Sequence, residues 1–251
     1  MTALITGASS GIGRDIARIL ANLGMRLIIS GRNTERLKEL QLELGRRRVK
    51  IITADISYRE ECLRLYEEAS KYNVDILINN AGFGLYGNFS DTDLERELEM
   101  IDVNITAVHI LTKLFLQDFT KRNKGYILNV ASSAGFLPGP LMSTYYATKN
   151  YVVRLTEAIH EELRRDNSNV YIGAFCPGPV DTNFNKTAGV RFALKGISST
   201  YAAECAVNGM LSRKPLIIPT ATMKAGVIAS RIVPDTLLSM VTAHMQQKKQ
   251  G

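Results

Sequence analysis

Two residues four positions apart, Tyr145 and Lys149, could carry out acid–base chemistry. If a helix begins near Ser143, both side chains fall on one face of it. A free tyrosine, with a pKa of about 10, is a poor base at neutral pH, and a neighbouring ammonium lowers that pKa by favouring the phenolate. Ser132, just after a strand-like run, would donate to a substrate oxygen as it gains charge. These residues predict proton transfer to or from an oxygen, as carbonyl reduction and its reverse require.

A glycine-rich loop favours the catalytic interpretation of Tyr145 and Lys149. Taken alone, such a pair would more simply be a core tyrosine and a surface lysine. A strand-like run leads into Thr6-Gly7-Ala8-Ser9-Ser10-Gly11-Ile12-Gly13, and a helical pattern follows. Gly7 allows a tight turn, Gly11 lets the backbone approach a pyrophosphate, and Gly13 lets the helix pack on the strand. The helix start then favours phosphate through its free N–H groups and its dipole. Against the alternative of a plain strand–helix turn, the loop predicts a dinucleotide site at Gly7, Ser9, Ser10, Gly11, Ile12 and Gly13.

The end of the second strand-like run indicates which dinucleotide is bound. It reads Ile29-Ser30-Gly31-Arg32-Asn33, at the place where a dinucleotide fold meets the adenosine ribose. No carboxylate stands there to accept from a free 2′-hydroxyl, whereas Arg32 offers a planar fork that suits a phosphate. Arg14, beside the last glycine, is placed to assist. The alternative for Arg32 is an ordinary exposed cation. We expect NADP(H) rather than NAD(H), with Arg32 and Asn33 in the cofactor site.

Apolar runs alternate with amphipathic stretches along the chain and predict the elements that position these residues. The apolar runs lack polar alternation, which is typical of strands buried on both faces of a parallel sheet. The expected strands are Ala3–Ile5, Arg26–Ser30, Val49–Thr53, Ile76–Asn79, Tyr126–Val130, Val170–Phe175 and Leu216–Pro219. The expected helices are Gly13–Leu23, Thr34–Leu44, Glu60–Lys71, Leu94–Phe119, Thr148–Arg164 and Thr200–Leu211, with starts at Asn33-Thr34 and Ser57 and stops at Gly24 and Gly45. The prediction is an α/β fold: a Rossmann-like, doubly wound parallel sheet of about seven strands with helices on both faces, in a single domain over residues 1–251.

At this point the sequence resembles the short-chain dehydrogenase/reductase family, over residues 1 to about 220. Several separate motifs in the right order carry the resemblance. They are the glycine loop, Asp55 after the third strand, Asn79-Asn80-Ala81-Gly82 after the fourth, Asn104 in the following helix, Ser132, Tyr145-x-x-x-Lys149, and Pro177-Gly178 after the sixth strand. The family pattern places the serine thirteen residues before the tyrosine, which selects Ser132 over Ser133, and only Tyr145, not Tyr146, has a lysine four residues on.

The resemblance implies a role for each matched residue. It implies that Asn104, Ser132, Tyr145 and Lys149 are catalytic, that Lys149 also holds the ribose hydroxyls, and that Asn104 holds a water linking Lys149 to solvent. The implied cofactor contacts are Asp55 and Ile56 at the adenine, Asn80, Ala81 and Gly82 on the adenosine side, and Pro177, Gly178, Val180 and Thr182 along the nicotinamide carboxamide. Simple turn chemistry is the alternative for Asp55-Ile56-Ser57, and a strand-ending turn for Asn79 to Gly82.

Residues 179–199 occupy the family's substrate-lid position. Their apolar members, Phe184, Val190, Phe192, Ala193 and Leu194, together with Phe83, Leu85, Tyr86, Phe136, Leu137 and Leu141, predict a mainly apolar pocket. We therefore expect an apolar or amphipathic ketone, aldehyde or oxoacyl substrate, or the corresponding alcohol. Residues 222–251 form a helical tail that Pro234 should break in two. We expect it to pack on its own domain or on a partner subunit. Association with a membrane surface is the disfavoured alternative, because the polar face is not strongly basic.

Composition narrows the class of protein further. With 251 residues, 45% hydrophobic, and a net charge of +7, the chain can bury a core and is not disordered. The basic residues are dispersed and the one dense run, Arg46-Arg47-Arg48, suits a solvated turn, so we expect no nucleic-acid partner. Three widely spaced cysteines, three scattered histidines and no secretory signal favour the cytoplasm, without a disulfide framework or a metal site.

These observations converge on an NADPH-dependent oxidoreductase that interconverts a carbonyl and an alcohol, with Tyr145 as general acid and base. The alternative is an NADP(H)-binding sensor or scaffold without turnover. The intact set of Ser132, Tyr145 and Lys149 argues against it, because a sensor needs no acid–base relay. The predicted helices over residues 94–119 and 148–164 resemble the pair that forms the family's subunit bundle, so we expect a homodimer or homotetramer.

Overall fold

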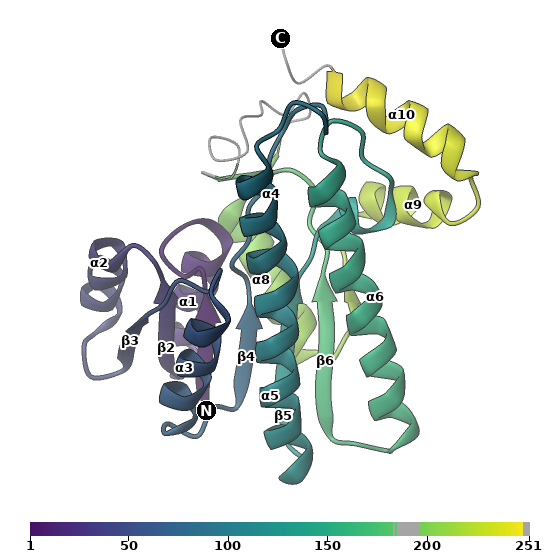
Figure 1. The fold of residues 1–251 in the computed structure, drawn as a ribbon. Coiled ribbons are helices and arrows are strands. Elements are labelled where there is room, and N and C mark those ends of the chain that lie inside the picture. The colour runs from purple at the N-terminus through teal and green to yellow at the C-terminus, as the bar shows by residue number, and fades with distance from the viewer. Residues whose placement is uncertain (183, 185–195, 248–251) are drawn as a thin grey trace.

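Seven parallel strands form one central sheet in the computed structural model, which describes residues 1–182, 184 and 196–247 (Figure 1). The strand order is β3-β2-β1-β4-β5-β6-β9. The chain winds outward from β1 to β3 and then returns to place β4 on the other side of β1, so the carboxyl ends of β1 and β4 flank a crevice suited to a ligand. The predicted doubly wound sheet is confirmed, with strands β1 (Thr2–Thr6), β2 (Arg26–Gly31), β3 (Val49–Thr53), β4 (Ile76–Asn79), β5 (Gly125–Val130), β6 (Val170–Phe175) and β9 (Leu216–Ile217).

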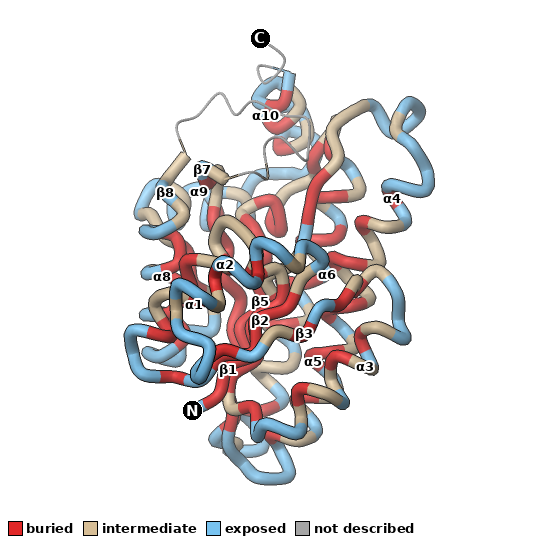
Figure 2. The backbone as a smooth tube through the Cα atoms, turned by 90° about the vertical axis from the view of Figure 1, so that its left-hand side faces the viewer, coloured by how far each residue is buried: buried red, intermediate tan, exposed pale blue. Residues whose placement is uncertain are grey.

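Helices cover both faces of the sheet, and each face has its own hydrophobic core. Consecutive strand residues alternate between the two cores, as Ile28 and Ile29 of β2 do. Both faces of the central strands are therefore shielded from water, which is why these strands carry no polar alternation. In Figure 2 the central strands are buried, whereas the helices and the edge strand β3 expose part of their length. One core is covered by α1 (Gly11–Asn22), α2 (Thr34–Leu44) and α8 (Ser199–Leu211), and the other by α3 (Arg59–Ser70), α4 (Leu94–Ile101), α5 (Ala107–Lys121) and α6 (Ser143–Arg165).

Some predicted boundaries were wrong. The single helix expected over residues 94–119 is interrupted by a π-helical turn, η1 (Asp102–Thr106). Helix α6 begins at Ser143 rather than Thr148. Helix α3 begins at Arg59, and its N-cap is Tyr58, which makes no side-chain cap hydrogen bond; Ser57, the predicted start, donates its hydroxyl to Asp55. The predicted start of α2 at Asn33 is confirmed, since the Asn33 side chain accepts from the Arg36 N–H.

The tail folds back over the end of the sheet toward which the strands point (Figure 1). It forms α9 (Ala221–Ser230) and α10 (Asp235–Gln247), so the predicted interruption at Pro234 is confirmed. Thr242 of α10 donates to the Pro138 carbonyl over 2.8 Å, and Gln246 donates to the Tyr146 hydroxyl over 2.5 Å. The tail thus packs on its own domain. Over the part of the chain described here, no helix combines the length and the apolar character needed to cross a bilayer.

Candidate active site

A cavity of about 770 Å³ lies at the carboxyl edge of the sheet, within the usual size of small-molecule sites. It gathers residues from many segments of the chain, from the glycine loop near the N-terminus to the tail. Of the predicted site residues it is lined by Gly7, Ser9, Ser10, Gly11, Ile12, Arg32, Asn33, Asp55, Ile56, Asn80, Ala81, Gly82, Ser132, Tyr145, Lys149, Pro177, Gly178, Val180 and Thr182. Gly13 and Asn104 are not in the lining, and each packs directly behind it.

The glycine loop is held in a form that only glycine adopts easily. Gly7 and Gly11 have φ of 65° and 55°, in the left-handed region. A Cβ on Gly13 would stand 2.3 Å from the Asn80 amide nitrogen, which donates to the carbonyls of Thr6 and Gly7 over 3.0 and 3.2 Å. Ser10, the N-cap of α1, makes no side-chain cap, so the first N–H groups of the helix are left for a ligand. These features fit the pyrophosphate of a dinucleotide.

At the expected ribose end, Arg32 meets two carboxylates. Its guanidinium lies 2.8 Å from Glu99 of α4 and 3.8 Å from Asp55, and its side chain is 59% exposed. Asp55 also accepts from the Ser57 hydroxyl over 2.8 Å, so the expected turn chemistry is present alongside its place in the cavity wall. The site therefore presents one arginine whose charge is already partly balanced.

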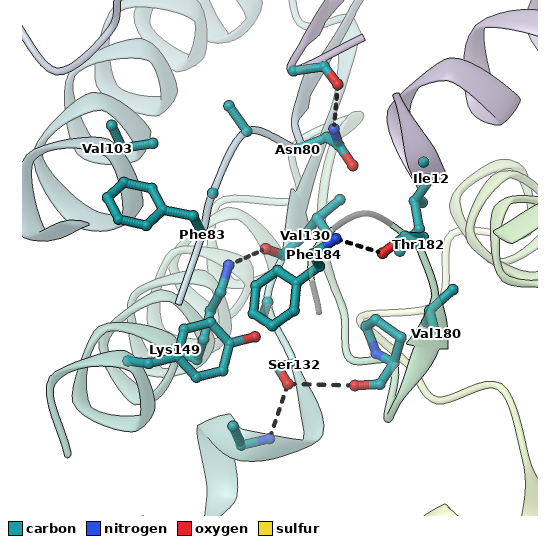
Figure 3. A pocket seen from close by; sticks show the side chains of 18 of the residues that line it. Ile12, Asn80, Phe83, Val103, Val130, Ser132, Lys149, Val180, Thr182 and Phe184 are labelled. Atoms are coloured by element: carbon teal, nitrogen blue, oxygen red, sulfur yellow. Dashed lines mark hydrogen bonds between the residues drawn. The ribbon is translucent and has the colours of Figure 1, made fainter. Parts of the chain in front are cut away.

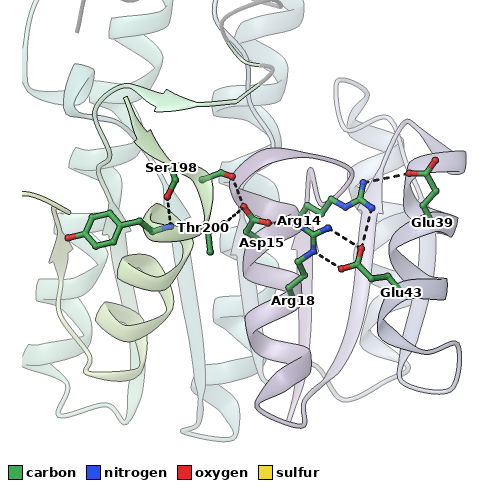
Figure 4. Close-up of polar contacts among 9 residues, drawn as sticks. Arg14, Asp15, Arg18, Glu39, Glu43, Ser198 and Thr200 are labelled. Carbon is green, nitrogen blue, oxygen red and sulfur yellow. Dashed lines mark hydrogen bonds and ion pairs between the residues drawn. The ribbon is translucent and has the colours of Figure 1, made fainter. Parts of the chain in front are cut away.

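The expectation that Arg14 assists Arg32 was wrong. Arg14 pairs with Glu39 and Glu43 of α2, as Figure 4 shows, and it is not among the residues that line the cavity. The neighbouring Arg18 pairs with Glu43 as well, over 2.6 Å. Because two carboxylates on α2 face the first turns of α1, the Arg14 side chain turns away from the ligand space.

The acid–base residues meet where β5 ends. Tyr145 and Lys149 lie one turn apart on α6, both buried, with the Lys149 ammonium 5.9 Å from the centre of the Tyr145 ring. The ammonium donates to the Val130 carbonyl over 3.0 Å. Ser132 accepts from the Ala134 N–H over 3.1 Å and donates to the Pro177 carbonyl over 3.4 Å, an arrangement visible in Figure 3. The structure therefore brings Ser132, Tyr145 and Lys149 to one wall of the cavity.

Burial shapes the protonation of this group. Loss of solvation raises the pKa of the Tyr145 phenol, and a hydrogen bond with Ser132 opposes that rise. Burial lowers the pKa of Lys149 to about 8, because a low-dielectric surrounding disfavours the ammonium. Near neutral pH, Tyr145 thus holds its proton, as a general acid must, and Lys149 is charged in most molecules.

Asn104 lies behind the cavity wall, where it forms hydrogen bonds with other protein groups. It lies in the π-helical turn η1, a feature often found at functional sites. Its amide accepts from the Phe83 N–H over 3.1 Å and donates to the Phe83 carbonyl over 2.9 Å and to Thr148 over 3.0 Å. A Cβ on Gly82 would meet both Asn104 and Lys149, at 2.9 and 3.3 Å. Asn104 thus holds the Gly82–Phe83 segment against α6, and its water-holding role stays a prediction.

Beyond Tyr145 the cavity becomes apolar. Phe184 stands 5.4 Å from the Tyr145 ring, and Phe83 and Leu137 also line this part, as predicted. The expectation was wrong for four residues that do not line it, Leu85, Tyr86, Phe136 and Leu141; Phe136, for example, is buried in the core beside α6. The predicted wall residues Val190, Phe192, Ala193 and Leu194 lie outside the described residues.

Several lining residues were not predicted, and five of them lie at the substrate end or in the tail: Met142, Met223, Thr242, Met245 and Gln246. Four of them belong to the tail, which carries no local motif for a binding site. The two ends of the expected lid segment, residues 179–199, are joined by the parallel pair β7 (Val180–Asp181) and β8 (Ile197–Ser198). Ser199 then donates to the buried Asp15 of α1 over 2.5 Å, which places the base of the segment against the glycine-loop helix (Figure 4).

Two further expectations can be compared with the described residues. The three cysteines are free thiols that form no disulfide, and Cys62 and Cys176 are buried. Across residues 1–182, 184 and 196–247, no group of three or more histidine, cysteine or acidic side chains is placed to hold a metal ion.

Comparison with known proteins gives a consistent result. A family model described as short chain dehydrogenase matches residues 1–191. An uncharacterized oxidoreductase of Staphylococcus epidermidis is 34% identical over 182 residues, which cover 72% of this chain and 78% of that protein. A short-chain dehydrogenase from Sphingobium yanoikuyae in complex with NADPH has a TM-score of 0.83 and 29% identity, covering 92% of this chain and 93% of the other. A short chain dehydrogenase/reductase from Burkholderia phymatum in complex with NAD has a TM-score of 0.82 and 26% identity, covering 90% and 91%.

Proposed function

The chain belongs to the short-chain dehydrogenase family, and we propose that it is an NADPH-dependent oxidoreductase that interconverts a carbonyl compound and an alcohol. The observation that carries this proposal is the meeting of Ser132, Tyr145 and Lys149 in the same cavity as the glycine loop. A glycine loop alone would support binding only, whereas an acid, a hydrogen-bond donor and a buried ammonium beside it are the groups that reduction of a carbonyl needs.

In the reaction we propose, the nicotinamide supplies the hydride when it is bound. Ser132 donates a hydrogen bond to the carbonyl oxygen and holds it beside Tyr145. Tyr145 transfers its phenolic proton to that oxygen as negative charge develops, which leaves a phenolate. The Lys149 ammonium, 5.9 Å from the ring centre, stabilises the phenolate until a proton returns from solvent. Oxidation of an alcohol runs the same proton path in reverse.

Oxidation of NADPH in the presence of ketones, aldehydes and oxoacyl thioesters tests this function. We expect turnover with apolar or amphipathic members of the panel, because the substrate part of the cavity is lined mostly by aromatic, leucine and methionine side chains. Tight NADPH binding without turnover of any panel member would assign the chain to the sensors or scaffolds instead.

We further propose that residues 179–199 form the substrate lid. The three unpaired cysteines support the cytoplasm as the compartment.

The preference for NADPH rests on Arg32. No carboxylate occupies the end of β2, and a Cβ on Gly31 would lie 3.6 Å from the Ser9 hydroxyl, an ordinary contact. The relatives do not decide the choice, since one was solved with NADPH and another with NAD. Arg32→Ala should weaken NADPH binding roughly ten- to hundredfold and leave NADH nearly unchanged, because one charge-assisted phosphate contact is lost. Fluorescence titration with both cofactors measures this.

Two further variants sharpen that measurement. Glu99→Gln removes the carboxylate 2.8 Å from Arg32 and should strengthen NADPH binding by freeing the guanidinium. Gly31→Asp should shift the preference toward NADH, because it adds a ribose acceptor and repels the 2′-phosphate. Equal losses of NADPH and NADH affinity in Arg32→Ala would contradict the assignment of Arg32.

We also propose that the protein is a homodimer or homotetramer built on α5 and α6. These two helices lie side by side and are joined at their exposed surface by the His109 ring and the Tyr151 hydroxyl, 2.7 Å apart. Sedimentation at micromolar concentration should therefore show at least twice the 27.8 kDa chain mass. Tyr151→Arg should lower that mass, since it places a charge on the surface of α5 and α6 that we propose to form the contact. Tyr58→Arg, at an exposed site on α3's N-cap, is the matched control, and a monomeric wild type would refute the proposal.

A further inference from the structure

The tail contributes one member of a polar pair, Gln246 and Tyr146, to the mainly apolar end of the cavity. Gln246 on α10 donates from its amide nitrogen to the Tyr146 hydroxyl over 2.5 Å, and both residues line the cavity. Tyr146 packs edge-on against Tyr145, with ring centres 6.1 Å apart. The pair therefore lies one aromatic ring away from the expected catalytic acid.

This pair is left incompletely hydrogen-bonded. Gln246 is 1% exposed, and its side-chain oxygen is buried without a partner among the described residues. Within the same ranges, the Tyr146 hydroxyl accepts from Gln246 and is the donor in no hydrogen bond. If the amide is turned over, the hydroxyl donates to the amide oxygen and the amide nitrogen is left free. In either orientation the pair keeps at least one unused donor and at least one unused acceptor.

The surrounding contacts hold the pair in place. Tyr86 donates to the Gln246 backbone carbonyl over 3.3 Å, and Thr242, one turn earlier on α10, donates to the Pro138 carbonyl over 2.8 Å. Burial raises the pKa of Tyr146, so its hydroxyl keeps its proton at neutral pH. A buried polar group that lacks a partner costs free energy, and a bound ligand that pairs with both groups recovers it.

We propose that Gln246 and Tyr146 form a subsite for a hydroxyl group on the substrate, away from the carbonyl that is reduced. A hydroxyl is the simplest single group that accepts from one partner and donates to another. A second carbonyl would satisfy only the donor, and an ammonium would satisfy only the acceptor at a high cost of burial. Leu137, Met142 and Met245 near this end require an apolar body between the two oxygens. The substrate class is thus an apolar hydroxyketone or hydroxyaldehyde, an inference that rests on the proposed function.

The test compares pairs of ketones that differ only by one hydroxyl. Suitable pairs are benzylacetone with its para-hydroxyl derivative, cyclohexanone with and without a hydroxyl on the opposite carbon, and linear methyl ketones with a terminal hydroxyl at increasing separation. Wild-type protein should prefer the hydroxyl member of at least one pair in kcat/KM by roughly ten- to hundredfold, the usual cost of leaving buried polar groups unpaired. Gln246→Met and Tyr146→Phe should bring that ratio close to one.

Gln247→Met is the matched control, because Gln247 is the exposed neighbour on the same helix; it should keep the wild-type ratio. Tyr146→Phe keeps the ring that packs on Tyr145 and so serves if Gln246→Met does not fold. Equal kcat/KM for both members of every pair, or a preference that survives in Gln246→Met and Tyr146→Phe, would overturn the subsite.

The subsite and the proposed function can fail separately. If no ketone is reduced, the proposed function falls, and calorimetric binding of the same pairs to the NADPH-loaded protein decides the subsite. Tighter binding of the hydroxyl member, lost in Gln246→Met and kept in Gln247→Met, supports it. Equal binding of both members refutes it.

Discussion

Tyr145→Phe should lower kcat for ketone reduction by about 10²–10⁴-fold, the usual contribution of a positioned general acid. The substitution removes only the phenolic oxygen and its proton, and the ring can keep its contact with Phe184, 5.4 Å away. NADPH binding should persist within about tenfold, since at most one hydrogen bond is lost. Steady-state NADPH oxidation and a separate cofactor titration together distinguish loss of chemistry from loss of binding.

Tyr72→Phe is the control for this prediction, because Tyr72 is exposed and lies just before β4, at the end of the sheet opposite the cavity. It loses the same oxygen and should retain wild-type kcat. A Tyr145→Phe variant that reduced ketones at the wild-type rate would show that another group supplies the proton.

Lys149→Met should lower kcat/KM by about 10²–10³-fold, as expected when a group that stabilises developing charge is removed. Methionine is close to lysine in length and carries no charge. The wild-type enzyme should also show a pH limit set by this residue. Its pKa is lowered to about 8, so the ammonium is present below that pH and is lost above it. Tyr145, whose pKa burial raises, keeps its proton through this range.

We therefore expect kcat/KM for reduction to be level below about pH 7 and to fall by about tenfold per pH unit above about 8. Lys149→Met should lack this fall, and Lys71→Met, at an exposed position after α3, should keep it. A wild-type profile that stays level through pH 10 would mean that the charge on Lys149 does not assist the reaction.

Local motifs were predictable because neighbouring residues alone set their geometry. The left-handed glycines Gly7 and Gly11, the Asn33 cap and the one-turn spacing of Tyr145 and Lys149 each follow from backbone preferences over a few residues. Central strands were equally clear, since burial on both faces leaves a short apolar run, as in β6 (Val170–Phe175). The π-helical turn around Asn104 could not be predicted from the sequence, because an inserted residue in a helix leaves the apolar pattern almost unchanged.

The amino-acid sequence by itself determined the family, the succession of strands and helices along the chain and many residues of the cavity wall. Tertiary structure alone decided which distant side chains meet there. Glu99 faces Arg32 from 67 residues away, Glu43 draws Arg14 toward α2, and Gln246 reaches Tyr146 across 100 residues. The local pattern of apolar residues indicates which face of a helix or strand is buried. The three pairings depend instead on how whole helices pack against one another. The cofactor end of the site could thus be predicted from motifs, and the substrate end took its shape from the packing of the tail.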